Sequence, residues 1–180
     1  MIPVDWYAAR AAGIVAYALI TLSVLVGLLL SGRAKPKGWP AFAVTDVHRF
    51  AGILAGVFVG IHVFALSLDT VMPISLTQLL VPGAAHYRPF WVGMGTVAGE
   101  LLIAVAVTTR LKKWLGFARW KRWHYLGFAV WLASTAHGIG AGTDTNEHWL
   151  RLLYVCAVGS VAAATVWRLG RSAVAVPARS

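Results

Sequence analysis

The sequence predicts an all-α integral membrane protein, a single helical bundle over residues 1–180 in which five helices cross the bilayer. Three observations predict this fold: the apolar composition, five long apolar runs, and the alternation of positive charge along the chain. Of the 180 residues, 59% are hydrophobic and only 12% are charged, whereas a soluble domain has about 25% charged residues. The composition therefore indicates a chain that is surrounded by lipid.

Five apolar runs are long enough, at about 17–25 residues, to cross the hydrocarbon core of a bilayer. They lie near residues 11–30, 47–68, 90–109, 123–139 and 149–167. The first run is not expected to be a signal peptide, because its apolar part exceeds the usual 7–15 residues or so and no basic segment precedes it. The longest connection, residues 69–89, contains prolines around ISLTQLL. We expect it to lie on the outer membrane surface as a short interfacial helix.

The positive charges lie mostly in alternate connections. Lys and Arg total 16, and apart from Arg10, Arg88 and Arg151 they fall in three segments, residues 33–49, 110–122 and 168–179. Five crossings put these three segments on one side, so the positive-inside rule predicts a cytoplasmic C-terminus and an outer N-terminus. Topology explains the charge, and we therefore expect the plasma membrane of a bacterium and no binding to nucleic acid.

Several common cofactor motifs are missing from the sequence. Cys156 is the only cysteine, which excludes a disulfide framework, zinc or iron–sulfur spacing, and covalent haem attachment. The run GIGAG at 138–142 follows a membrane helix rather than a strand, so it fails the context of a dinucleotide-binding motif. Five spans leave no room for a flavin or nicotinamide domain. Any such cofactor would have to come from a separate polypeptide.

Four histidines stand inside the apolar runs. In the second run His62 follows His48 at position i+14, and in the fourth run His137 follows His124 at position i+13. Ionisable groups inside a membrane are functional candidates by default, although a single one could equally be a packing residue. The two helices run in the same direction, so His48 is level with His124 and His62 with His137. The two levels are about 20 Å apart at 1.5 Å per residue.

Each level pair could hold one flat cofactor between two parallel helices. Bis-imidazole ligation of two non-covalent haem b groups is the interpretation that uses all four histidines, and it makes the fold a haem-binding helical bundle. A step of i+14 at about 100° per residue ends about 40° short of four turns, which keeps both histidines on one face. A step of i+13 ends about 140° short. The fourth helix is therefore expected to depart from ideal geometry by a tilt or by a 3₁₀ or bulged turn, unless its haems are rotated.

The same residues resemble a known family, the ferric-reductase-like transmembrane superfamily. It includes the membrane part of NADPH oxidases and the haem subunit of the methionine sulfoxide reductase system. The resemblance lies in HRFAGILAGVFVGIHVF at 48–64, in the pattern L-G-x₃-W-x₂-W-H-x-L at 115–126, and in the i+14 and i+13 spacings of the histidines. It implies a b-type cytochrome with two haems that moves single electrons between a cytoplasmic donor and an outer acceptor. Such a protein would be a transmembrane oxidoreductase or its electron-transfer subunit.

The resemblance also suggests roles for other residues. The family places an aromatic residue between its haems, where this chain has Trp131, although packing explains this residue equally well. Arg49 and Arg122 flank the cytoplasmic pair, and Arg88 and Arg151 are the nearest cations for the outer pair. These arginines are candidates for haem propionate contacts. Topology and lipid anchoring are the competing explanations.

Two further sites are weaker candidates. On the outer face, His86 and His148, with neighbouring carboxylates, could hold Fe³⁺ or Cu²⁺, or could be solvated loop residues. Glu100 lies near the middle of the third span, where a carboxylate must be protonated or partnered. It could relay protons or form a structural hydrogen bond to a neighbouring helix.

The electron donor stays open at this point. The flavin and nicotinamide domain of the oxidases is absent, so the donor is expected to be a separate cytoplasmic flavoprotein or a quinol. One alternative function is a haem-bearing membrane anchor subunit of a larger quinol-linked oxidoreductase complex. Another is a metal-ion transporter. The transporter is disfavoured because two ligands at each level leave each metal ion short of ligands.

Overall fold

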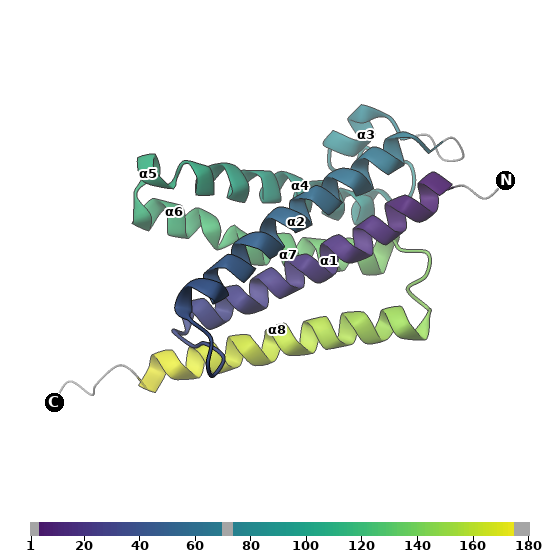
Figure 1. The fold of residues 1–180 in the computed structure, drawn as a ribbon. Coiled ribbons are helices and arrows are strands. Elements are labelled where there is room, and N and C mark those ends of the chain that lie inside the picture. Colours follow the sequence, from purple (N-terminus) through teal and green to yellow (C-terminus); the bar gives the residue numbers. More distant parts are fainter. Residues whose placement is uncertain (1–3, 70–73, 175–180) are drawn as a thin grey trace.

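The computed structural model describes residues 4–69 and 74–174, and every regular element in these ranges is a helix (Figure 1). The predicted all-α fold is therefore confirmed. In chain order the helices are α1 (Val4–Ser31), α2 (Ala41–Ser67), α3 (Leu76–Leu80), α4 (Pro89–Arg110), α5 (Lys112–Leu115), α6 (Phe117–His124), α7 (Leu126–Ala141) and α8 (His148–Val174).

Within these ranges, four helices are long and apolar enough to cross a membrane: α1, α2, α4 and α8. The sequence predicts a fifth crossing near 123–139, but here the structure has two shorter helices. α6 ends at His124, and α7 has 16 residues, or about 24 Å at 1.5 Å per residue. A bilayer core is about 30 Å thick. The structure thus shows four candidate membrane-spanning helices, and α7 by itself is shorter than a span.

The junction between α6 and α7 lies at Tyr125. The N–H of Phe128 donates to the carbonyl of Tyr125 (3.1 Å), a bond between residues i and i+3 that tightens the turn. Residues in such a 3₁₀ turn rotate by about 120° instead of 100°. The junction therefore recovers part of the rotation by which His124 and His137 would otherwise miss a common face. This is the kind of departure from a regular helix that the i+13 spacing predicts.

The helices are arranged around α1 (Figure 1). α1 lies antiparallel to α2 and also contacts α7 and α8, while α4 packs against α7. The start of α1 and the end of α8 lie at opposite ends of the bundle (Figure 1). Two helix pairs, α1 with α2 and α4 with α7, therefore make up most of the packing, and α1 joins them.

The buried core lies where α1, α7 and α8 meet. Val130 and Trp131 of α7 pack there with Tyr17 of α1 and Tyr154 of α8. The indole Nε1–H of Trp131 donates to the hydroxyl of Thr21 on α1 (3.1 Å). A buried tryptophan needs such a partner for its N–H. This bond ties α7 to α1 in the middle of the bundle.

Many large apolar side chains are exposed instead. Phe50, Ile53, Ile103 and Leu152, from three of the long helices, are each more than 60% exposed. A soluble protein rarely exposes such continuous apolar surface. The outward apolar side chains fit a lipid bilayer, which would cover them.

The connection between α2 and α4 contains the short helix α3. Its first turn is closed by a capping box, in which the Gln78 N–H donates to Ser75 Oγ (3.3 Å) and the Ser75 N–H to Gln78 Oε1 (2.9 Å). Such reciprocal bonds satisfy two of the free N–H groups at a helix start. The sequence places a short helix in this same loop.

The Trp131–Thr21 hydrogen bond gives a prediction about stability. Thr21→Val keeps the shape of the side chain but leaves the buried indole N–H without an acceptor, which should lower the free energy of unfolding by about 1–3 kcal/mol. Thr165→Val is the matched control, because both hydroxyls donate to the carbonyl four residues earlier, but only that of Thr21 also accepts from an indole. Thermal unfolding in detergent measures both variants. Equal melting temperatures would contradict a stabilising role for the bond.

Candidate functional site

The structure brings the four histidines together as two pairs. The His48 ring of α2 lies 5.8 Å, centroid to centroid, from the His124 ring at the end of α6. The His62 ring of α2 lies 6.1 Å from the His137 ring of α7. The ring planes cross at 73° and 76°. These are the pairs that the helix directions predict, and α2 contributes one member to each.

The two pairs are far apart along the bundle. His48 and His62, at positions i and i+14 of one continuous helix, are separated by about 21 Å along its axis. All four side chains are half-buried. The arrangement is thus two separate sites at different depths rather than one cluster of four ligands.

Three of the histidines are fixed through Nδ1 by a backbone carbonyl of a neighbouring helix. The acceptors are Ala9 for His62 (2.7 Å), Ser23 for His48 (2.8 Å) and Trp91 for His137 (3.0 Å). Because a carbonyl oxygen can only accept, Nδ1 must carry the proton and Nε2 keeps its free electron pair. Histidines that bind metals typically have this arrangement, since the second hydrogen bond fixes the tautomer and the ring orientation.

Each of these three imidazoles also packs against a glycine. A Cβ atom at Gly13 would lie 3.0 Å from His62 Nδ1, and one at Gly27 would lie 3.3 Å from His48 Cε1. A Cβ atom at Gly95 would lie only 2.6 Å from His137 Nδ1. Any larger residue at these positions would push the imidazole away. The glycines therefore make room for the rings between the helices.

Glycine and carbonyl belong to one repeated contact. In all three cases the carbonyl stands one helical turn before the glycine, at i and i+4: Ala9 with Gly13, Ser23 with Gly27, Trp91 with Gly95. In an α-helix the carbonyl of residue i already accepts from the N–H of residue i+4, and its second lone pair stays available. Without a side chain at i+4, an imidazole can reach that lone pair. We call this arrangement the glycine–carbonyl contact.

These three glycines were not among the site residues predicted from the sequence, although the spacing of two of them could have revealed them. Gly27 follows Gly13 at position i+14 in the first helix, the same spacing as between His48 and His62 in the second. In an antiparallel pair of helices, equal spacings allow both contacts to form in one register. Equal spacings of glycines and histidines in adjacent helices would therefore have located the glycines against which the imidazoles pack.

His124 is held differently from the other three histidines. Its Nδ1 is the one buried side-chain nitrogen or oxygen without a hydrogen-bond partner in the part of the chain that the structure describes. The ring stacks on Trp120, one turn earlier in α6, at 4.9 Å and an angle of 27°. The His48–His124 pair is therefore less symmetric than the His62–His137 pair.

The predicted arginines have other contacts in the structure. Arg88 donates from Nη1 to the carbonyl of Gly140 (2.6 Å), at the end of α7 and close in sequence to His137. Arg49 pairs with Asp46 at 3.6 Å. Arg122 and Arg151 are exposed. A role for any of these four in binding propionates stays a prediction.

An ion pair lies at the end of the bundle that the sequence predicts to face outwards. Arg10 of α1 pairs with Asp144 in the connection between α7 and α8, while His86 and His148 are both exposed. Within 4–69 and 74–174, no three His, Cys, Asp or Glu side chains gather as a metal-binding group. Glu100 is exposed on α4. The outer metal site and the proton relay both stay predictions.

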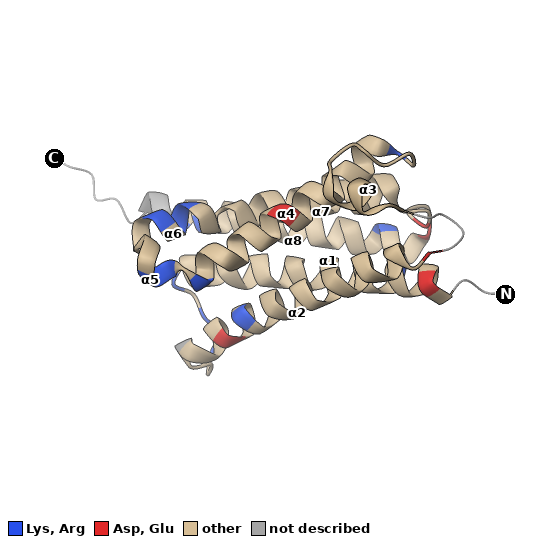
Figure 2. Ribbon diagram, turned by 90° about the horizontal axis from the view of Figure 1, so that it is seen from above, with Lys and Arg blue, Asp and Glu red and all other residues tan. Residues whose placement is uncertain are grey.

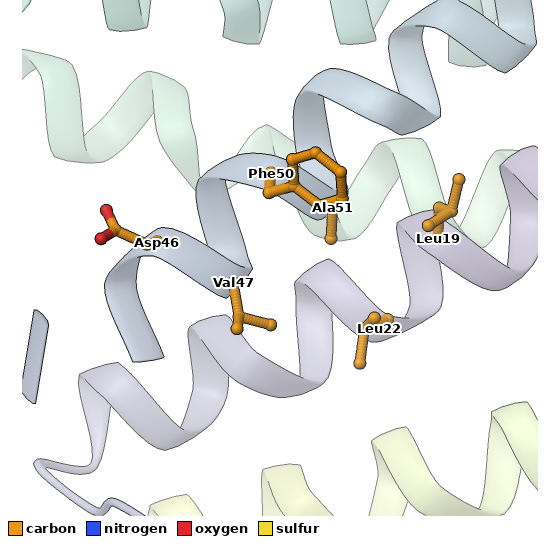
Figure 3. Close-up of a pocket in the computed structure, with 6 residues that line it drawn as sticks. All are labelled: Leu19, Leu22, Asp46, Val47, Phe50 and Ala51. Atoms are coloured by element: carbon orange, nitrogen blue, oxygen red, sulfur yellow. The ribbon is translucent and has the colours of Figure 1, made fainter. Parts of the chain in front are cut away.

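A separate groove lies between α1 and α2 (Figure 3). Its lining side chains are Leu19, Leu22, Asp46, Val47, Phe50 and Ala51. The lining is almost entirely apolar and includes none of the four histidines. On an outward face such a groove can be filled by lipid chains, and it adds no chemistry to the histidine pairs.

The chain matches no protein-family model, no curated protein and no solved structure. A function for this protein is therefore inferred from the geometry of the two histidine pairs.

Proposed function

We propose that the protein is a b-type membrane cytochrome with two haems that moves single electrons between a cytoplasmic donor and an outer acceptor. His48 and His124 would hold an inner haem through their imidazoles, and His62 and His137 would hold an outer haem. The donor would be a separate cytoplasmic flavoprotein or a quinol. The observation that carries the proposal is the presence of two facing imidazole pairs at two depths, each with Nδ1 engaged on at least one ring.

The separation of the rings fits a metal held between two imidazoles. With a metal–nitrogen bond of about 2.0 Å and a ring nitrogen about 1.1 Å from the ring centre, the two centroids would lie about 6.2 Å apart. The observed separations are 5.8 and 6.1 Å. The crossed ring planes, at 73° and 76°, leave both imidazoles of each pair free to hold such a group. Two imidazoles per iron also match haem, whose ring supplies the four remaining ligands.

Haem held in this way supplies a one-electron carrier without an open coordination position. The protein's own residues do the rest. The carbonyls of Ala9, Ser23 and Trp91 orient three imidazoles and increase their basicity. Trp131 lies on α7 between the histidines of the two sites, with its indole fixed by Thr21. In the proposal its ring provides an aromatic path between the two depths.

The charge distribution supports an orientation. Most Lys and Arg residues lie at the end of the bundle formed by α5, α6 and the start of α2 (Figure 2). His48 and His124 belong to that same end. By the positive-inside rule we place this end in the cytoplasm and the opposite end, with His62 and His137, outside. Arg49 and Arg122 are then the cations nearest the inner pair in sequence.

The proposal also includes α6 and α7 as a fifth crossing. α7 is short by itself, but α6 lies directly before it and extends it on the other side of the tight turn at Tyr125. Together they reach from His124 to His137, level with the histidines at both depths on α2. A segment that contributes to both sites must extend through the same layer of the membrane as α2.

The first test of this function is an absorption spectrum of the purified protein. We expect a Soret band that shifts on reduction with dithionite, and about two haems per chain. His62→Ala should lose about half of the bound haem, because one of two irons loses an axial ligand. His86→Ala, at an exposed histidine outside both pairs, should lose none. A purified protein without a Soret band would refute the function, and equal losses from the two variants would refute the ligand assignment.

The glycine–carbonyl contact gives a second prediction. Gly95→Ala places a methyl group 2.6 Å from His137 Nδ1, so the ring must move and the outer haem should be lost. Gly99→Ala is the matched control, one turn further along α4, where an added Cβ meets nothing within 4 Å. Alanine favours a helix over glycine by up to about 1 kcal/mol, so the control should fold at least as well. Haem content per chain, measured as the pyridine haemochrome, compares them, and full haem content in Gly95→Ala would contradict the role of the glycine.

A further inference from the structure

The strongest asymmetry between the two histidine pairs is at His124. Its three counterparts each donate from Nδ1 to a backbone carbonyl beside a glycine, whereas the buried Nδ1 of His124 has no partner among the described residues. A buried polar atom without a partner costs about 1–3 kcal/mol. Something other than a hydrogen bond must therefore hold this ring in place.

The sequence of α4 explains why no carbonyl is available. Gly95 of α4 lies beside His137, and the two helices are antiparallel. His124 lies 13 residues before His137, so the residue of α4 expected at its level is 13 residues after Gly95, which is Thr108. A glycine–carbonyl contact at this level would need a glycine there and a free carbonyl at Ala104. Instead, the Thr108 hydroxyl donates to that same carbonyl of Ala104 (2.7 Å). The position is filled by a side chain, and the second lone pair of the carbonyl is used.

A stack of side chains takes the place of the missing bond. The His124 ring lies on the ring of Trp120 at 4.9 Å, and the Lys112 ammonium lies 3.9 Å from the centroid of that same tryptophan ring. The Trp120 Nε1–H donates to Thr109 Oγ1 on α4 (3.3 Å). Trp120 is therefore fixed at its edge and in contact on its ring with both a cation and the imidazole.

From these contacts we infer that Trp120 is a positioning residue for His124. It holds the imidazole by stacking, as the backbone carbonyls hold the other three by hydrogen bonds. The inference rests on the proposed haem function. Its first consequence is that the inner haem, between His48 and His124, depends on Trp120 and the outer haem does not.

A second consequence concerns the redox potentials. A carbonyl that accepts from Nδ1–H makes the imidazole a stronger electron donor to the iron, which favours the oxidised state. Both ligands of the outer haem have such a carbonyl, whereas the inner haem has it only at His48. The Lys112 charge near the stack favours the reduced state further. The inner haem should therefore have the more positive midpoint potential.

The test compares three tryptophan variants of the full-length protein in detergent. Trp120→Leu removes the stacking ring, Trp120→Phe keeps a ring but loses the bond to Thr109, and Trp123→Leu is a control on the same helix. Trp123 is 48% exposed, and the His124 ring stacks on Trp120 instead. Haem content, the low-spin signals in electron paramagnetic resonance, and a spectroscopic redox titration are measured for each. His124→Ala identifies which wave of the titration belongs to the inner haem.

We expect Trp120→Leu to bind the inner haem about 10–100-fold more weakly, the range typical of residues that orient a metal ligand. It should lose the more positive wave, which is also the wave that His124→Ala loses, and keep the other. Trp120→Phe and Trp123→Leu should keep both. Unchanged low-spin signals in Trp120→Leu, loss of both haems together, or loss of the more negative wave would each overturn the inference. Absence of haem from the unsubstituted protein would refute the proposed function instead.

Discussion

The arrangement of the site depends on one interaction, the hydrogen bond from an imidazole Nδ1–H to a helix carbonyl that a glycine leaves open. Helix carbonyls are normally covered by the side chain one turn ahead. The bond at Ala9, Ser23 or Trp91 forms because Gly13, Gly27 or Gly95 has no such side chain. The same contact gives the imidazole N–H a partner in an apolar layer and brings the two helices close together. It also points Nε2 away from the helix that carries the carbonyl.

The sequence predicted those features that depend on composition and on regular spacing along the helices. The helical class follows from composition and run length, and the pairing of His48 with His124 and of His62 with His137 follows from helix direction and nearly equal spacing. The glycines that contact the imidazoles were not predicted. In the sequence alone, a glycine in an apolar run cannot be told from an ordinary packing residue until the facing side chain is known. For the turn at Tyr125, a 3₁₀ turn was one of several predicted departures, and its position was not predicted. No local residue there signals a tight turn, so its position depends on tertiary packing.

The remaining difference concerns the fourth predicted span, which the structure shows as two shorter helices. The apolar run at 123–139 looks like the others in the sequence, but the structure divides this region at Tyr125 and leaves a helix of 16 residues. The four longer helices expose much of their apolar surface, and α7 contributes its buried Val130 and Trp131 to the core. A helix that packs against both α1 and α4 faces less lipid than its hydropathy suggests. Hydropathy records apolar character and does not distinguish lipid from protein as its cause.

The matched spacing of the glycines on α1 and the histidines on α2 has a consequence for assembly. Two contacts that share the i+14 spacing admit one alignment of the helix hairpin, since sliding by one turn would place Tyr17 or Ala9 opposite His62, and Ser23 or Ser31 opposite His48. Each of those residues has a Cβ atom where the ring needs space. The hairpin can therefore find its register before any cofactor arrives. It would then present one correctly placed imidazole at each depth to whatever binds there.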